Sequence, residues 1–158
     1  MTDFENAIKK MKKLFSRDYQ FALSTCDNNI PSVRFIDAYF DGEAFYVVTY
    51  ALSQKIRDIA SNSNVALCGR KAHSFSGIAD NIGHPLLPNN AQIRDTLIKI
   101  FEPWYFEANN EEDSNMCYVK IKPTSGFFYK DGIGYKMNFT EKIVETFPFS
   151  GDIGLVDE

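Results

Sequence analysis

The sequence lacks long apolar runs, and its longest, such as residues 44–48, fall far short of a membrane span. A membrane helix needs roughly 20 consecutive apolar residues. Asp3 and Glu5 occupy positions where a secretory signal peptide would be basic and then apolar. We therefore expect a soluble, cytoplasmic protein that does not enter a membrane.

An excess of positive charge is also missing, since 17 basic residues face 21 acidic ones and the net charge is −4. Nucleic-acid binding rests on a positive surface, so none is expected. The three cysteines, Cys26, Cys68 and Cys117, are odd in number and widely spaced, which supports neither a disulfide framework nor a zinc knuckle. His73 and His84 have no acidic or cysteine partner at metal spacing, so we expect no metal site.

What the chain does have is a high apolar content, 44% in 158 residues. A folded chain of this length buries roughly 70% of the surface that its unfolded form exposes, which is enough for one domain without staples. We expect this domain over residues 1–143. The tail over residues 144–158 carries four acids and no base, and we expect it to be poorly ordered or docked on a partner chain.

The order of the expected elements is typical of a barrel. Phe4, Ile8, Met11 and Phe15 recur at helical spacing after a capping box at residues 2–5. Short strands follow, over residues 19–26, 33–40, 44–49, 65–70, 74–82, 116–122, 127–129 and 133–139. Short helices are expected after Ser53, which can cap the first of them, and over residues 91–102, with a solvated loop at residues 107–115.

Consecutive hairpins join most of these strands, with tight turns at residues 27–29 and at the Asp-Gly pairs 41–42 and 131–132. About seven strands linked in this way, with two or three helices, indicate a mainly β fold in which an antiparallel sheet closes into a barrel.

Both faces of the strand over residues 33–40 are largely apolar. One face carries Val33, Phe35 and Tyr39, and the other carries Arg34, Ile36, Ala38 and Phe40. Because an antiparallel strand normally leaves one face to water, a helix, a second subunit or a planar ligand must cover the outer face.

The end of the third strand and the start of the next helix bring together Thr49, Ser53 and Lys55. Helix starts accept anions, so these donors favour a phosphate monoester. The alternative is an ordinary N-cap serine beside a solvated lysine. Arg34 adds weight to the phosphate hypothesis, because a guanidinium on an apolar face is costly unless it meets an anion or a polar edge. An edge-strand arginine that reaches water is the other interpretation.

Taken in order, these residues resemble a known family. Arg34-Phe35-Ile36, the 41–42 hairpin, Thr49 with Ser53 and Lys55, residues 64–67 and the strand of Gly77 resemble the pyridoxamine 5′-phosphate oxidase-like, FMN-binding split-barrel family. The similarity is to its small general-stress and nitroimidazole-reductase-like branch, and it extends from the first helix to about Phe139. Each motif is short, and their order and spacing carry the resemblance.

The resemblance implies a homodimer of six-to-seven-stranded split barrels with two FMN molecules at the interface, acting as an oxidoreductase on a small molecule. It places Lys55, Ser53 and Thr49 on the FMN phosphate, with Gln54 at a phosphate-binding position of the family. It places Arg34 and the main chain of Phe35 and Ile36 along the flavin.

Several positions depart from the true oxidases. Tyr39 stands where they have lysine, Gln54-Lys55 replaces an Arg-Lys pair, Ala72 stands where a glutamine is expected, and an acidic tail replaces their arginine-rich substrate segment. These departures argue against synthesis of pyridoxal phosphate. No general acid or base stands out, which suits chemistry in which the cofactor moves the hydride. A non-catalytic module that stores or senses flavin or haem is the alternative, and deazaflavin is another possible cofactor.

The aromatic segment over residues 101–106 could pack across a dimer interface or form a wall beside a flavin, and Trp104 is its candidate for a cofactor contact. Ordinary core packing is the alternative for at least two of these aromatic residues.

Overall fold

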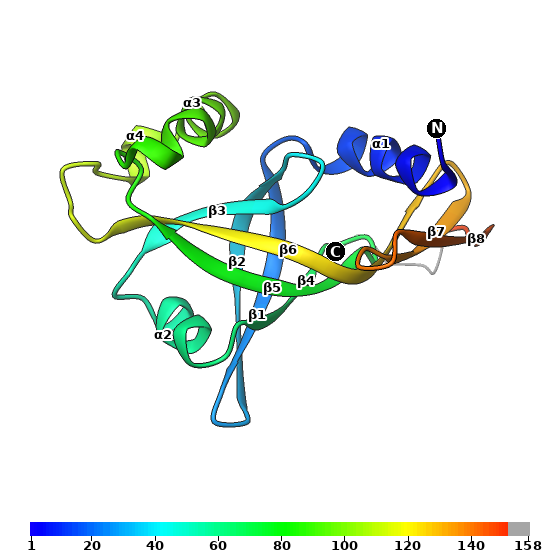
Figure 1. Ribbon diagram of the computed structural model, residues 1–158, viewed down its shortest axis with the longest axis horizontal. Helices are drawn as coiled ribbons and strands as arrows, with labels where there is room; N and C mark the ends of the chain where they lie inside the picture. Colours follow the sequence, from blue (N-terminus) through cyan, green and yellow to red (C-terminus); the bar gives the residue numbers. More distant parts are fainter. Residues whose placement is uncertain (152–158) are drawn as a thin grey trace, which may run out of the picture.

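The chain folds into an antiparallel barrel, seen in a computed structural model that describes residues 1–151 (Figure 1). The helices span Asp3–Phe15 (α1), Gln54–Ser61 (α2), Ala91–Ile100 (α3) and Tyr105–Ala108 (α4), with a short 3-10 turn at Pro88–Asn90 (η1). The strands span Tyr19–Asp27 (β1), Ile30–Phe40 (β2), Phe45–Tyr50 (β3), Asn64–Cys68 (β4), Ser74–Gly83 (β5), Met116–Lys130 (β6), Ile133–Asn138 (β7) and Ile143–Pro148 (β8).

The strand order is β3-β2-β1-β4-β5-β6-β7-β8, and β3 also pairs with β6. This extra pairing closes six strands into a barrel, while β7 and β8 extend the sheet beyond it. The mainly β, split-barrel expectation is therefore confirmed, and the closed barrel has six strands, within the six to seven that the resemblance implies.

The first helix forms where its capping residues predict it. The Thr2 hydroxyl accepts from the Glu5 amide at 3.1 Å, and the Glu5 carboxylate accepts from the Thr2 amide at 2.7 Å. The buried face of α1 consists of Ala7, Met11 and Phe15, which join the barrel core.

Two of the three expected tight turns have the expected backbone. Asn28 and Asn29 have φ of 52° and 62°, and Asp131 and Gly132 have φ of 54° and 77°. Both pairs thus hold the positive φ that primed two-residue turns require.

The third turn differs, because β3 resumes only at Phe45 and the connection is four residues long. Only Gly42 has positive φ, at 110°. The Asp41 Oδ1 atom accepts from the amides of Glu43 at 2.7 Å and Ala44 at 2.8 Å. A side-chain oxygen therefore organises this turn in place of the expected primed geometry.

The two strands expected over residues 116–122 and 127–129 form one continuous strand, β6. Its first half pairs with β3 and its second half with β7, while β5 lies along its other edge. Gly77 allows the close approach of β5, since a Cβ at this position would lie 2.6 Å from the Lys122 carbonyl oxygen. A single strand thus belongs to both the barrel and its extension.

The segment from residue 144, expected to be poorly ordered or docked on a partner chain, instead continues the sheet. β8 pairs with β7 from Ile133↔Pro148 to Asn138↔Ile143. The expected boundary between residues 143 and 144 thus runs through this strand, and the last part of the tail, residues 152–158, lies outside the described residues.

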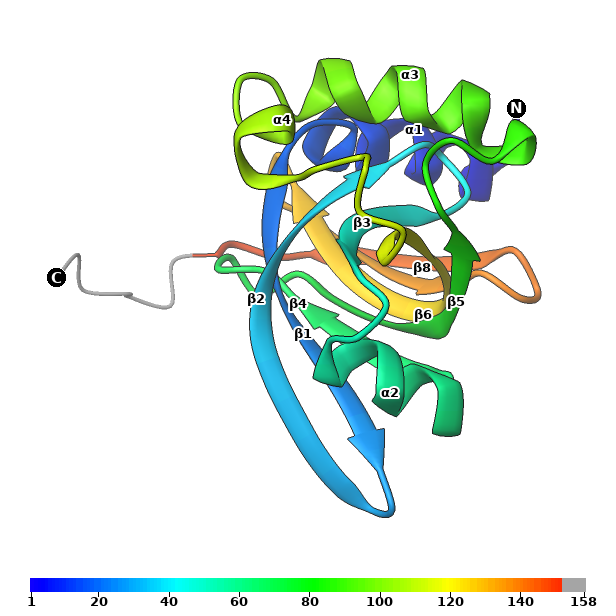
Figure 2. The ribbon, with the colours of Figure 1, turned by 90° about the vertical axis from the view of Figure 1, so that its left-hand side faces the viewer.

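Helices cover half of the outer face of β2. Tyr39, Tyr46 and Tyr118 pack with Leu97 and Phe101 in a second apolar cluster. Figure 2 shows α3 and α4 together on one side of the barrel. Farther along β2, Val33 and Phe35 are each 69% exposed. Helices therefore cover one half of the outer face of β2, and an apolar strip on the other half stays exposed.

None of the helices described is long and apolar enough to cross a membrane. Within residues 1–151, no three histidine, cysteine or acidic side chains gather as metal ligands would.

Candidate functional site

The barrel is split between β2 and β3. These strands pair only at Tyr39↔Tyr46 and Phe40↔Phe45. Beyond this point residues 30–38 of β2 pair with β1 alone, while β3 runs on to Tyr50 and the chain turns into α2. The split thus leaves residues 34–36 on an unpaired strand edge.

Arg34 meets an anion inside the protein. Its Nη1 donates to the Thr25 Oγ1 at 2.7 Å and to the Leu23 carbonyl at 3.3 Å, and its Nη2 lies 3.7 Å from the Asp58 Oδ2. The expectation that this guanidinium needs an anion is met by α2 itself, through a residue that the sequence analysis did not single out.

Asp58 is the centre of this polar network, with 1% of its surface exposed. It accepts from the Thr25 hydroxyl and from the Gln54 amide, both at 2.6 Å. These hydrogen bonds lower the pKa of its carboxyl, so it stays ionised. The one signal in the sequence is its spacing of four residues from Gln54, which brings the two side chains onto one face of a helix.

Lys55 supplies a cation without a counterion. Its Nζ donates to the Thr49 Oγ1 at 2.9 Å, and no described carboxylate lies within ion-pair distance of it. Burial, together with the nearby charge of Arg34, lowers the pKa of this amine. Arg34 and Lys55 carry two positive charges against the single negative charge of Asp58, so the cluster would gain from an added anion.

Ser53 has a buried hydroxyl with no hydrogen-bond partner in the described chain. It occupies the N-cap position of α2, yet its side chain does not cap the helix, contrary to the expectation. An unsatisfied buried hydroxyl costs about 1–3 kcal/mol, so a ligand oxygen would be favoured here. With the first amides of α2 and the Lys55 ammonium, the residues present fit a phosphate ester.

The other residues predicted to contact the cofactor differ in how accessible they are to a ligand. Phe35 is 69% exposed, whereas Ile36 lies in the core, so only its main chain can meet a ligand. The Gln54 amide is already used, since it donates to Asp58 and accepts from Arg57. The fold brings together Thr49, Ser53, Lys55 and Arg34, which form the Lys55 cluster.

Trp104 lies apart from this cluster. Its Nε1 donates to the Asp18 Oδ2 at 2.7 Å, and its ring packs on Phe101 with centroids 4.7 Å apart. Asp18 precedes β1, whose opposite half holds Thr25. Within one chain Trp104 therefore does not meet the Lys55 cluster, and its contact with a cofactor stays a prediction.

Comparisons with known proteins identify a family from the sequence and a fold from solved structures. The family model described as pyridoxamine 5′-phosphate oxidase matches residues 7–129. No curated protein matches the chain significantly.

Three solved structures illustrate the range of relatives. General stress protein 26 from Bacillus anthracis is 22% identical, with a TM-score of 0.56, over 80% of this chain and 93% of that one. A FAD-binding protein from Mesorhizobium loti is 12% identical, with a TM-score of 0.58, over 75% and 90%. HutZ, the haem storage protein from Vibrio cholerae, is 13% identical, with a TM-score of 0.58, over 77% and 91%.

At these identities the structures show the fold alone, and the fold hosts more than one cofactor. The family model spans most of the chain, including the split and the Lys55 cluster. The chain belongs to the pyridoxamine 5′-phosphate oxidase family.

Proposed function

We propose that the protein is a cytoplasmic, FMN-binding oxidoreductase that acts as a homodimer on a small molecule. The observation that carries this proposal is the half-buried Lys55 without a counterion, beside the unpartnered Ser53 hydroxyl at the start of α2. A terminal phosphate would supply the negative charge and the acceptors that both groups lack.

The split beside this cluster suits a flat ring. The phosphate would be held by Lys55, Ser53 and Thr49, and the ring would lie along the unpaired edge of β2 at residues 34–36. The exposed Val33 and Phe35 side chains would then be covered by a second copy of the chain. The bound FMN supplies the redox chemistry, and these residues bind and orient it.

Arg34 would adjust the electrostatics of the ring. A positive charge near the pyrimidine edge of a flavin favours its anionic reduced form. Because Asp58 lies 3.7 Å from this guanidinium, it offsets part of that charge. The pair therefore provides a smaller positive field than an isolated arginine.

The titratable protein groups near the cluster would take no direct part in the redox reaction. Cys117 pairs with Thr49 in the sheet, and burial raises the pKa of its thiol to about 11, so it stays protonated. Asp58 is buried and already accepts two hydrogen bonds. The departures at Tyr39 and Gln54 continue to argue against pyridoxal phosphate as the product.

A second candidate is a non-catalytic module that stores or senses a flavin or haem, in line with the haem storage protein among the similar structures. The histidines do not favour haem. His73 is 3% exposed and stacks on Tyr129. Both ring nitrogens of His84 lie within hydrogen-bond distance of main-chain groups, at Asp113 and Leu86.

An absorbance spectrum of the purified protein tests the proposal. We expect a flavin spectrum, bleaching by NADPH or another donor, and tighter binding of FMN than of riboflavin, which lacks the phosphate. A colourless protein that ignores added FMN would refute flavin binding. Flavin binding without turnover would favour the storage or sensor alternative, and a Soret band on addition of haem would favour haem.

A further inference from the structure

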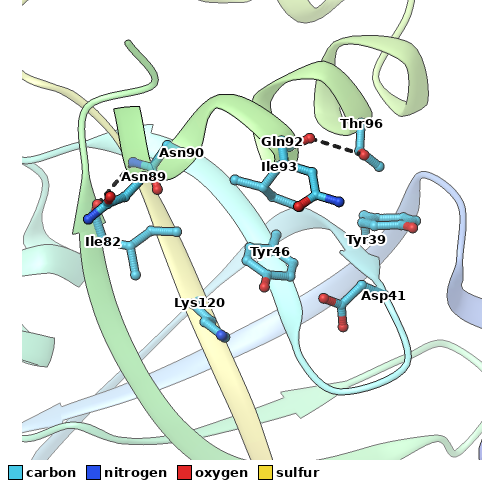
Figure 3. A pocket seen from close by; sticks show the side chains of 10 residues that line it. All are labelled: Tyr39, Asp41, Tyr46, Ile82, Asn89, Asn90, Gln92, Ile93, Thr96 and Lys120. Atoms are coloured by element: carbon cyan, nitrogen blue, oxygen red, sulfur yellow. Dashed lines mark hydrogen bonds between the residues drawn. The ribbon is translucent and has the colours of Figure 1, made fainter. Parts of the chain in front are cut away.

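A groove of about 710 Å³ lies between α3 and the outer face of the barrel (Figure 3). Its floor is formed by Tyr39 of β2, Tyr46 of β3 and Lys120 of β6. These three residues are paired neighbours across adjacent strands. None of the residues that line the groove belongs to the Lys55 cluster, so this is a separate hollow.

The two ends of the groove carry opposite charges that do not meet. Asp41 lies at one end beside Tyr39, and Lys120 lies at the other beside Ile82 (Figure 3). Both side chains are partly buried, and neither has an ion-pair partner within residues 1–151. Partly desolvated charges of this kind gain from a ligand that carries the complementary charges.

The spacing of the strands sets the width of the groove floor. Neighbouring strands lie roughly 4.8 Å apart, so Tyr39 and Lys120, two strands apart, are separated by about 10 Å. The Tyr46 ring lies between Lys120 and Asp41, and the Tyr39 ring lies beside Asp41 (Figure 3). The Lys120 ammonium is 5.9 Å from the centre of the Tyr46 ring. A ligand of this length would therefore cross an aromatic floor.

We propose that this groove binds a small rod-shaped aromatic zwitterion. Its anionic group lies at Lys120, its ring lies against Tyr39 and Tyr46, and its cationic group lies at Asp41. Offset aromatic contacts hold the ring, and the two charged ends fix its direction.

The rim of the groove restricts what can enter. Asn89, Gln92 and Thr96 project polar side chains from the α3 side, and Ile82 and Ile93 are the aliphatic lining residues. A rim of this composition favours a small polar aromatic molecule over a lipid chain or an apolar helix. Burial and the nearby Asp41 raise the pKa of the Tyr46 phenol, so it stays protonated beside that carboxylate.

Titration calorimetry with 4-(aminomethyl)benzoate, benzoate and benzylamine on the full chain tests this assignment. We expect Lys120→Met to weaken binding of the two carboxylates about tenfold and to spare benzylamine. Asp41→Asn should weaken binding of the two amines about tenfold and spare benzoate. Lys99→Met, on the exposed face of α3 outside the groove, is the matched control and should change nothing.

The variants are chosen so that a loss of binding can be distinguished from a loss of folding. Asparagine keeps the Oδ1 atom that accepts the two loop amides, and thermal unfolding checks that each variant is intact. The proposal fails if 4-(aminomethyl)benzoate shows no saturable binding, or if the variants weaken all three probes equally. Displacement of the probe by FMN would likewise refute it, because the groove would then belong to the flavin site.

Discussion

Two partly or fully buried carboxylates, Glu111 and Asp58, organise polar networks on different parts of the barrel. The two networks differ in whether the polar groups around the carboxylate all have partners. The Glu111 carboxylate accepts hydrogen bonds from Nε and Nη2 of Arg94, both at 2.7 Å, and from the Tyr105 hydroxyl at 3.0 Å. The Tyr105 hydroxyl in turn lies 2.5 Å from that of Tyr118. The Glu111 network thus closes on itself.

The network of Asp58 is left open. Its arginine stands 3.7 Å away, and beside it lie the Lys55 ammonium without a counterion and the Ser53 hydroxyl without an acceptor. A closed network fastens a loop to a helix, whereas surplus donors and surplus charge mark a place where a ligand completes the structure. The satisfied groups around Glu111 therefore indicate a structural role, and the unsatisfied charge and hydroxyl near Asp58 indicate a binding role.

The strongest way to break the closed network is Glu111→Ala. It leaves the guanidinium of Arg94 and the Tyr105 hydroxyl without their acceptor, and we expect a loss of about 3 kcal/mol in the free energy of unfolding. Urea denaturation measures this loss, with Glu112→Ala, on the exposed neighbour, as the control. FMN affinity of the folded variant should be unchanged, and a weaker affinity would contradict the division of roles.

Lys55→Ala tests the open network. Removing a charged hydrogen-bond donor should weaken FMN binding by about 2 kcal/mol, or roughly thirtyfold, and leave riboflavin binding nearly unchanged. Quenching of flavin fluorescence provides the measurement, and Lys13→Ala, on the exposed side of α1, is the control. Equal losses for FMN and riboflavin would show that the lysine does not recognise a phosphate.

Ser53→Ala should have a smaller effect on binding and an opposite effect on stability. FMN affinity falls by about 1 kcal/mol, or roughly fivefold, because one neutral hydrogen bond is lost. The cofactor-free protein should become slightly more stable, since a buried hydroxyl without a partner is removed. Thermal unfolding without FMN checks this, and a loss of stability there would mean that the hydroxyl already has an acceptor.

The smallest expected effect is on the stability of the protein at acidic pH. Hydrogen bonds from Arg94 lower the pKa of Glu111, so its stabilisation is present above the unfolded-state value and is lost as the pH falls through the folded-state value. Glu111→Gln should therefore flatten the decline in the free energy of unfolding between about pH 5 and pH 3. Identical slopes for the variant and the natural protein would contradict this assignment.

Local patterns predicted the fold well where local chemistry decides it. The capping box at Thr2, the turns at Asn28-Asn29 and Asp131-Gly132, and the change from helix to hairpins all follow from neighbouring residues. The β8 strand was missed because the acidic composition of residues 144–158 as a whole indicates solvent, whereas the pairing of β8 with β7 depends on contacts across the sheet. The Asp41 turn was missed because a side-chain oxygen, rather than positive φ at two residues, sets it.

The candidate site was predicted in the same uneven way. Thr49, Ser53, Lys55 and Arg34 were found because helix starts and lone charges on apolar faces have a recognisable chemistry. Asp58 was missed, because its importance comes from Thr25 and Arg34 on strands distant in the sequence. A buried carboxylate that serves residues elsewhere in the chain looks, in one sequence, like any helical acid.

The pairing of β2 along one edge only has a consequence for local opening of the structure. Residues 30–38 pair with β1 alone, and β4 pairs only with residues 22–24 of β1, so residues 25–27 and 30–32 form a two-stranded ribbon at the tip of this hairpin. Such a ribbon frays with far less free energy than global unfolding. Amide deuterium uptake should therefore be fast there in the empty protein, and its slowing would report, residue by residue, how far an occupant reaches along the ribbon.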